Sequence, residues 1–118
     1  MTPKERALDA LEWIQANPKH WAQNVWVQGM TYTDGSTYFR GCFATVTCLR
    51  AGLTVVDPCY ALAYTLPELA PLARDGRVHV FHATQYFYRL DEPTTARLTN
   101  AMNNLDGLKA QVASIFGV

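Results

Sequence analysis

Apolar residues recur at helical spacing in stretches that prolines and glycines separate, and this pattern constrains the fold more than any other feature of the chain. The first stretch opens with Thr2, Pro3 and Glu5, which is the signature of a capping box with a proline in the first turn. Side chains that share one helix face follow at Ala7, Leu8, Leu11 and Ile14. Because Pro18 cannot continue a helix, we predict that the first helix ends just before it.

Three later stretches show the same spacing. Residues 39–51 place apolar side chains on or near one face, and Gly52 follows where a glycine commonly ends a helix. Residues 91–105 begin with Asp-Glu-Pro, a composition typical of a helix start. Residues 106–116 predict a last helix, which Gly117 closes.

The segment between the first two predicted helices has strand character. Residues 25–32 favour an extended backbone, and the next four residues, Thr33 to Ser36, form a turn sequence. Its Asp34-Gly35 pair favours the left-handed conformations that tight turns need. We therefore predict a short hairpin that returns through residues 37–39.

Prolines divide residues 58–71 into short pieces. We predict short helices over residues 60–64 and 67–73. Residues 77–90 fit two structures, because their first part favours a strand and the part from His82 onward fits a helix about as well.

These patterns predict one domain, residues 1–118, of mainly α class. It has about four to five helices, with or without a short β-hairpin near residues 25–39. An apolar content of 49% in 118 residues is enough to form one core without disulfide staples.

Charge argues against nucleic acid as a partner. The 10 basic and 10 acidic residues cancel, and the basic ones are scattered along the chain. Affinity for a duplex depends strongly on clustered Lys and Arg, so the sequence does not favour nucleic-acid binding.

The location expected from the sequence is the cytoplasm. The N-terminal residues are amphipathic and charged, unlike a signal peptide. The longest apolar run, near residues 59–66, is much shorter than the ~20 residues of a membrane span. Three cysteines are an odd number, which is typical of reduced thiols and not of a disulfide framework.

The cysteines and histidines are the candidate metal ligands of this sequence. Five and ten residues separate Cys42, Cys48 and Cys59, whereas zinc sites commonly use pairs separated by two residues. On a helix, the first two point about 240° apart. We therefore predict no metal and interpret the cysteines as small buried side chains.

The same residues offer a catalytic alternative. A thiol at Cys42 near a helix start, with His79 or His82 downstream as base, is similar to the arrangement in papain-like peptidases of the cell-wall hydrolase type. This chain has Arg-Gly-Cys-Phe at residues 40–43, where those enzymes usually carry Asp-Cys-Ser-Gly. The favoured interpretation of the two histidines is one hydrogen-bonded within the fold and one solvated.

Aromatic residues suggest an interface. Three tryptophans lie in the first quarter, and Tyr86-Phe87-Tyr88 are consecutive, so they cannot all face one core. Since Trp and Tyr often anchor protein interfaces, we predict binding residues among them. The predicted set is Trp21, Trp26, Tyr32, Tyr86 and Tyr88. The alternative is that Trp21 and Trp26 complete a small core.

Other enzyme signatures are missing from the sequence. The evenly spaced glycines Gly29, Gly35 and Gly41 lack the lysine and the strand-to-helix setting of a phosphate loop. Carboxylates are sparse, and none are paired for acid–base work. We therefore predict a protein without a cofactor and without catalytic activity.

The layout resembles small domain-of-unknown-function proteins of actinobacteria and their phages. The resemblance rests on an amphipathic first helix, Trp21 with Gln23, the small-residue helix from Gly41-Cys42, and Asn103-Asn104 before the last helix. This chain has Ala44-Thr45 where those proteins usually have Gly-Ala. The resemblance implies no established activity.

We therefore predict a small non-enzymatic accessory or inhibitor protein, phage-encoded in keeping with the resemblance. It would bind a protein in the bacterial cytoplasm, either a host protein or a second copy of itself. Two alternatives remain. One is a cysteine-dependent hydrolase of papain-like type, and the other is a protein that binds a small ligand or nucleotide signal.

Overall fold

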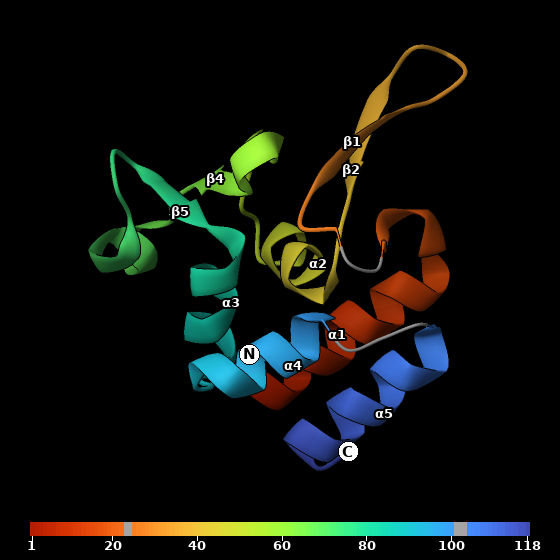
Figure 1. Ribbon diagram of the computed structural model, residues 1–118, viewed down its shortest axis with the longest axis vertical. Helices are drawn as coiled ribbons and strands as arrows, with labels where there is room; N and C mark the ends of the chain where they lie inside the picture. Colours follow the sequence, from red (N-terminus) through yellow and green to blue (C-terminus); the bar gives the residue numbers. More distant parts are fainter. Residues whose placement is uncertain (23–24, 101–103) are drawn as a thin grey trace.

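A computed structural model describes residues 1–22, 25–100 and 104–118, and it combines helices with two small sheets (Figure 1). The described residues form five α-helices: α1 Pro3–Ala16, α2 Phe43–Arg50, α3 Val80–Tyr88, α4 Glu92–Asn100 and α5 Leu105–Phe116. The strands are β1 Gln28–Thr31, β2 Thr37–Arg40, β3 Val55–Asp57, β4 Leu62–Tyr64 and β5 Arg77–His79. Three short 3-10 helices connect them: η1 Pro18–His20, η2 Pro58–Tyr60 and η3 Pro67–Leu72.

The first helix begins as predicted. The backbone N–H of Glu5 donates to Thr2 Oγ1 at 3.1 Å, and the Thr2 N–H donates to Glu5 Oε1 at 3.0 Å. This reciprocal capping box satisfies N–H groups that have no partner within the helix. Of the predicted apolar face, Ala7 and Ile14 are buried, while Leu8 is 41% exposed.

The second helix begins four residues later than predicted. Residues 37–40 pair with β1 as strand β2, so their backbone groups are already used by the hairpin. Gly52 follows the helix as predicted, with φ +94, and its N–H donates to Leu49 O at 3.2 Å. A left-handed residue at this place allows the last carbonyls of the helix to be satisfied.

The predicted hairpin is confirmed. β1 and β2 are antiparallel, with Thr31 opposite Thr37, and the Tyr32 N–H donates to Ser36 O at 2.7 Å across the loop. Asp34 accepts the Ser36 N–H at 2.9 Å, and Gly35 has φ +90. Figure 1 shows the hairpin projecting from the body of the molecule.

A second sheet was not predicted. β4 lies between β3 and β5, and all three pair antiparallel. The predicted helix over residues 60–64 is therefore wrong, because most of it is strand β4 and Ala61 takes a left-handed conformation with φ +54. Residues 77–90 contain both expected structures in succession, β5 and then α3.

The last two helices lie close to their predicted positions. The Thr94 N–H donates to Asp91 Oδ1 at 2.8 Å at the start of α4, and Asn104 Oδ1 accepts the Gly107 N–H at 2.8 Å at the start of α5. Gly117 ends α5 with φ +72. Residues 101–103, part of the apolar stripe predicted over 91–105, lie outside the described residues.

Helix α2 lies in the middle of the fold. It contacts both α1 and α3, and six of its eight residues are buried. One apolar cluster lies between the three-stranded sheet, α2 and α3, and a second lies among the helices. Cys48 belongs to the first cluster, whereas Phe43 and Val46 belong to the second, so α2 joins them.

The structure therefore corrects the fold class to a mixed helix-plus-strand domain, in which helices predominate. In the described parts of the chain, no helix combines the length and the apolar character needed to cross a membrane.

Candidate functional site

The predicted nucleophile Cys42 is buried. It is the N-cap residue of α2, with 3% of its surface exposed. Burial raises the pKa of the Cys42 thiol, although nearby N–H groups of Thr45 and Ala44 partly oppose this. A catalytic thiol needs a lowered pKa. No hydrogen bond among the described residues joins Cys42 to His79 or His82, so the geometry gives the hydrolase hypothesis no support.

The other cysteines also fail to form a site. Cys48 is fully buried, and burial raises its pKa to about 12. Cys59 is exposed. Within the described residues, no group of three or more His, Cys, Asp or Glu side chains is placed to hold a metal ion.

The prediction that Tyr88 belongs to a binding surface is wrong. Its side chain is 2% exposed and stacks on Phe43, with ring centroids 6.0 Å apart. Its hydroxyl hydrogen-bonds the Thr47 hydroxyl at 2.6 Å. Tyr88 therefore fills the core between α2 and α3 and satisfies its polar atom inside the protein.

Trp21 lies at the base of the hairpin, and Tyr32 lies at its loop. Trp21 is partly buried against the helical core, and its backbone forms a bridge with Gly41. The Tyr32 ring lies against Tyr38, and the Lys19 ammonium sits over it and hydrogen-bonds its hydroxyl. These contacts give both side chains partners within the chain.

Trp26 gathers with residues from β5 and α3. Its ring meets His79 at 5.1 Å between centroids and Phe81 at 5.8 Å, both edge-to-face. His82 continues the group, 6.0 Å from His79 and 5.9 Å from Phe81. We call Trp26, His79, Phe81 and His82 the tryptophan cluster. It reaches the surface, since Trp26 is 37% exposed and His82 is also exposed.

The backbone of Trp26 is held by α2. Thr45 donates its hydroxyl to the Trp26 carbonyl, and the Cys42 N–H donates to Val25 O at 2.7 Å. Gly41 lies against the same carbonyl, and a Cβ at Gly41 would overlap it. Close approach of two backbone segments, which only glycine permits here, thus fixes the tryptophan beside α3.

His79 is the N-cap residue of α3. Its Nδ1 accepts the Phe81 N–H at 3.0 Å, so in the neutral ring the proton is on Nε2. Burial lowers the pKa of His79, and the nearby His82 lowers it further. The neutral form is therefore the one that the fold stabilises.

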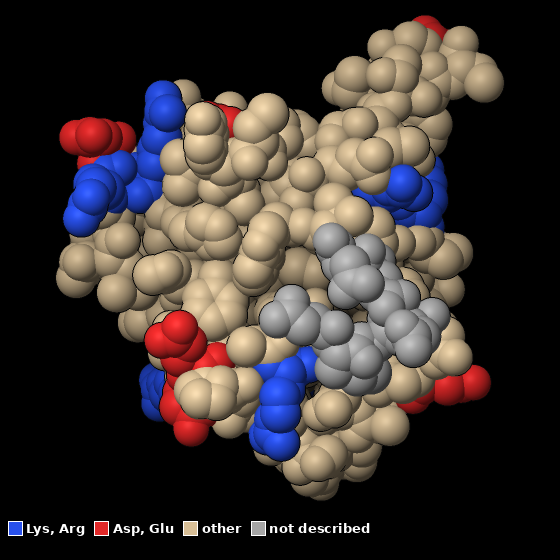
Figure 2. All heavy atoms as spheres, in the orientation of Figure 1, with Lys and Arg blue, Asp and Glu red and all other residues tan. Residues whose placement is uncertain are grey.

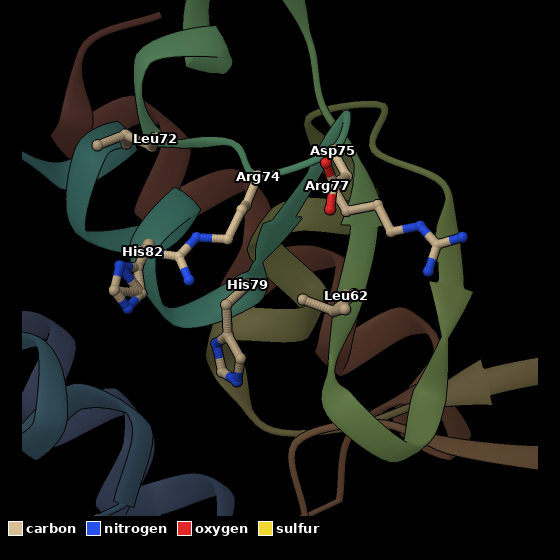
Figure 3. A pocket seen from close by; sticks show the side chains of 7 residues that line it. All are labelled: Leu62, Leu72, Arg74, Asp75, Arg77, His79 and His82. Atoms are coloured by element: carbon tan, nitrogen blue, oxygen red, sulfur yellow. The ribbon is translucent and has the colours of Figure 1, made fainter.

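A hollow of about 430 Å³ adjoins the cluster (Figure 3). It lies between β4, the turn before β5 and the start of α3, and both histidines line it. Figure 3 shows Arg74 running toward His82, whereas the Arg77 side chain extends away from both histidines. A second hollow of about 280 Å³ shares His82 and also borders Tyr86, which is 42% exposed.

Charges lie together near this hollow. Figure 2 shows basic and acidic atoms side by side at the end of the molecule that carries β4 and β5. The one ion pair recorded among the described residues joins Arg50 to Asp9 at 3.0 Å, in another part of the fold. Arg74 and Arg77 therefore carry charges that no bonded carboxylate balances.

Sequence reasoning named Trp26, Tyr86 and the two histidines but not their arrangement. It missed Phe81 as a surface aromatic and Arg74 as a pocket residue. The turn at Asp75-Gly76 was the available signal, because it lies directly before β5. Gln23 and Asn103, which contribute to the family resemblance, lie outside the described residues.

Comparisons with models of protein families, with curated proteins and with solved structures find no match to this chain.

Proposed function

We propose that this protein is a small non-enzymatic binding protein that docks another protein through the tryptophan cluster and the neighbouring Tyr86. The observation that carries the proposal is the exposed Trp26 ring, packed edge-to-face on His79 and Phe81. An accessory or inhibitory role on a bacterial host protein in the cytoplasm is the specific form of this proposal, in keeping with the surplus of aromatic residues and the missing catalytic motifs of the sequence.

Rigidity of the tryptophan supports this role. Trp and Tyr are the side chains that most often dominate binding energy at protein interfaces. A side chain that is ordered before binding loses less conformational entropy when the complex forms. Trp26 meets this condition, because its backbone is held by Thr45 and its ring by His79.

The buried thiols support a non-enzymatic role. Cys42 is covered, and its pKa is raised. A hydrolase that used this thiol would need it to be exposed and to ionise easily. The docking proposal requires no reactive group.

The experiment begins with capture of proteins from bacterial cytosol on the immobilised chain. Each captured protein is then purified and titrated by calorimetry against the wild type, Trp26→Ala, Tyr86→Ala and Leu8→Ala. Leu8 on α1 is the control, because it is exposed to a similar extent outside the cluster. Sedimentation velocity of the same proteins tests whether the partner is a second copy of the chain.

We expect Trp26→Ala to weaken binding by roughly thirty-fold or more, as loss of an interface anchor does. We expect a smaller loss for Tyr86→Ala and no change for Leu8→Ala. If Trp26→Ala unfolds, Tyr86→Ala carries the test, because its side chain is exposed. The proposal would be refuted if the wild type and all three variants bound with equal affinity. It would also be refuted if no protein were captured and the chain did not self-associate.

A further inference from the structure

The hollow beside the tryptophan cluster is lined by four nitrogen-bearing side chains that can donate hydrogen bonds: Arg74, Arg77, His79 and His82. Figure 3 shows Arg74 running toward His82, with His79 at the same opening. Arg74 makes no ion pair among the described residues. Asp75 also lines the hollow and brings one carboxylate to it, whereas the Arg77 side chain extends away from both histidines in the same view. The lining therefore combines two guanidinium groups with one carboxylate, which leaves it a net positive charge, and it presents N–H donors near the histidines.

The donor atoms can be assigned. The Nδ1 of His79 is already used by the Phe81 N–H, so its Nε2–H is the donor that remains. The His82 ring lies 6.0 Å from the His79 ring. A guanidinium offers paired N–H groups and each imidazole offers one. This set suits an acceptor with three terminal oxygens, which is a phosphate, better than a carboxylate with two.

Two apolar side chains complete the lining of the hollow. Leu62 from β4 and Leu72 from the end of η3 line it together with the polar residues. A volume of about 430 Å³ falls within the range of small-molecule sites, which combine apolar walls with a few oriented polar groups. The ligand that fits these walls has an apolar body as well as an anionic group.

We propose that this hollow binds a phosphate monoester with an apolar body. Arg74 and His82 hold the phosphate, His79 donates from Nε2, and the two leucines contact the body. This site shares His79 and His82 with the docking surface but uses neither Trp26 nor Tyr86. Arg74→Gln therefore tests the phosphate site and Trp26→Ala tests the docking proposal, so either can fail without the other.

The probe is phenyl phosphate, titrated by calorimetry into the full chain. We expect saturable binding with a dissociation constant below about 1 mM. Arg74→Gln and His82→Ala should each weaken it roughly ten-fold or more, since each removes a charge-assisted hydrogen bond. Arg97→Gln is the matched control, because it removes the same charge from an exposed arginine of α4 that does not line the hollow. It should change the affinity less than about two-fold.

Three further titrations define the ligand class. Benzyl alcohol should not bind, benzoate should bind roughly ten-fold more weakly than phenyl phosphate, and inorganic phosphate should compete for the same site. Equal binding of benzoate would overturn the assignment to phosphate. Absence of saturable binding of phenyl phosphate, or an equal loss in Arg97→Gln and Arg74→Gln, would overturn the site. All three variants alter exposed side chains, so thermal unfolding should show them folded.

Discussion

Substitution of Gly41 by alanine should destabilise the protein strongly and disturb the candidate site. A Cβ at this position would lie 2.8 Å from Thr45 Cβ and 2.9 Å from Thr45 Oγ1, and it would overlap the Trp26 carbonyl oxygen. Two of these contacts are with atoms that cannot rotate away, because one belongs to the backbone and one is attached directly to it. Either α2 or the Trp26 segment must therefore move.

The expected loss in the free energy of unfolding follows from two effects. Overpacking at a rigid position costs about 1–3 kcal/mol. Loss of the hydrogen bond from Thr45 to the Trp26 carbonyl adds about 1 kcal/mol. We expect the free energy of unfolding of Gly41→Ala to fall by about 2–4 kcal/mol.

Chemical denaturation followed by circular dichroism measures this change. Gly29→Ala is the control, because its Cβ would meet only Phe39 Cε1, at an ordinary 3.9 Å. Its stability should change by less than about 1 kcal/mol. Thr45→Ala should not rescue Gly41→Ala, since the Trp26 carbonyl remains in place. If Gly41→Ala is as stable as Gly29→Ala, the close approach that we infer to position Trp26 does not exist.

Three further predictions concern buried and titrating groups. Tyr88→Phe should cost about 1–3 kcal/mol, because the buried Thr47 hydroxyl loses its partner, and adding Thr47→Val should recover part of that loss in a double-mutant cycle. His79→Asn should keep the cap of α3 but flatten the dependence of stability on pH below neutrality. The fold lowers the pKa of His79, so the contribution of this residue to stability is present above the ordinary pKa of 6.5. That contribution is lost as the pH falls through the lower pKa of the folded state. Identical pH profiles of stability for this variant and the wild type would contradict the prediction. Iodoacetamide should alkylate Cys59 in the native protein and reach Cys42 only on unfolding, as mass spectrometry would show; rapid native labelling of Cys42 would revive the hydrolase alternative.

Features that depend on neighbouring residues could be predicted from the sequence. The capping box of Thr2 and Glu5, the helix ends at Gly52 and Gly117, and the turn at Asp34-Gly35 are all present in the structure. In each case the deciding hydrogen bond or dihedral angle involves residues within a few positions of one another. Such interactions form without knowledge of the rest of the chain.

Features that depend on distant pairing could not be predicted in this way. The strands β3, β4 and β5 have three residues each, too few to show a periodic pattern, and they become strands by pairing with one another. The helix predicted from residue 39 begins only at Phe43 for a similar reason. Residues 37–40, which precede α2, pair with strand β1 instead.

The candidate site is also a feature that depends on contacts between distant residues. The sequence alone predicts helices, a hairpin and more aromatic rings than one helix face can bury. Only tertiary packing decided that Tyr88 fills the core while Trp26 meets His79 and Phe81 at the surface. The physical reason is that burial and ring contacts depend on which segments pack together, and these residues come from segments far apart in the chain.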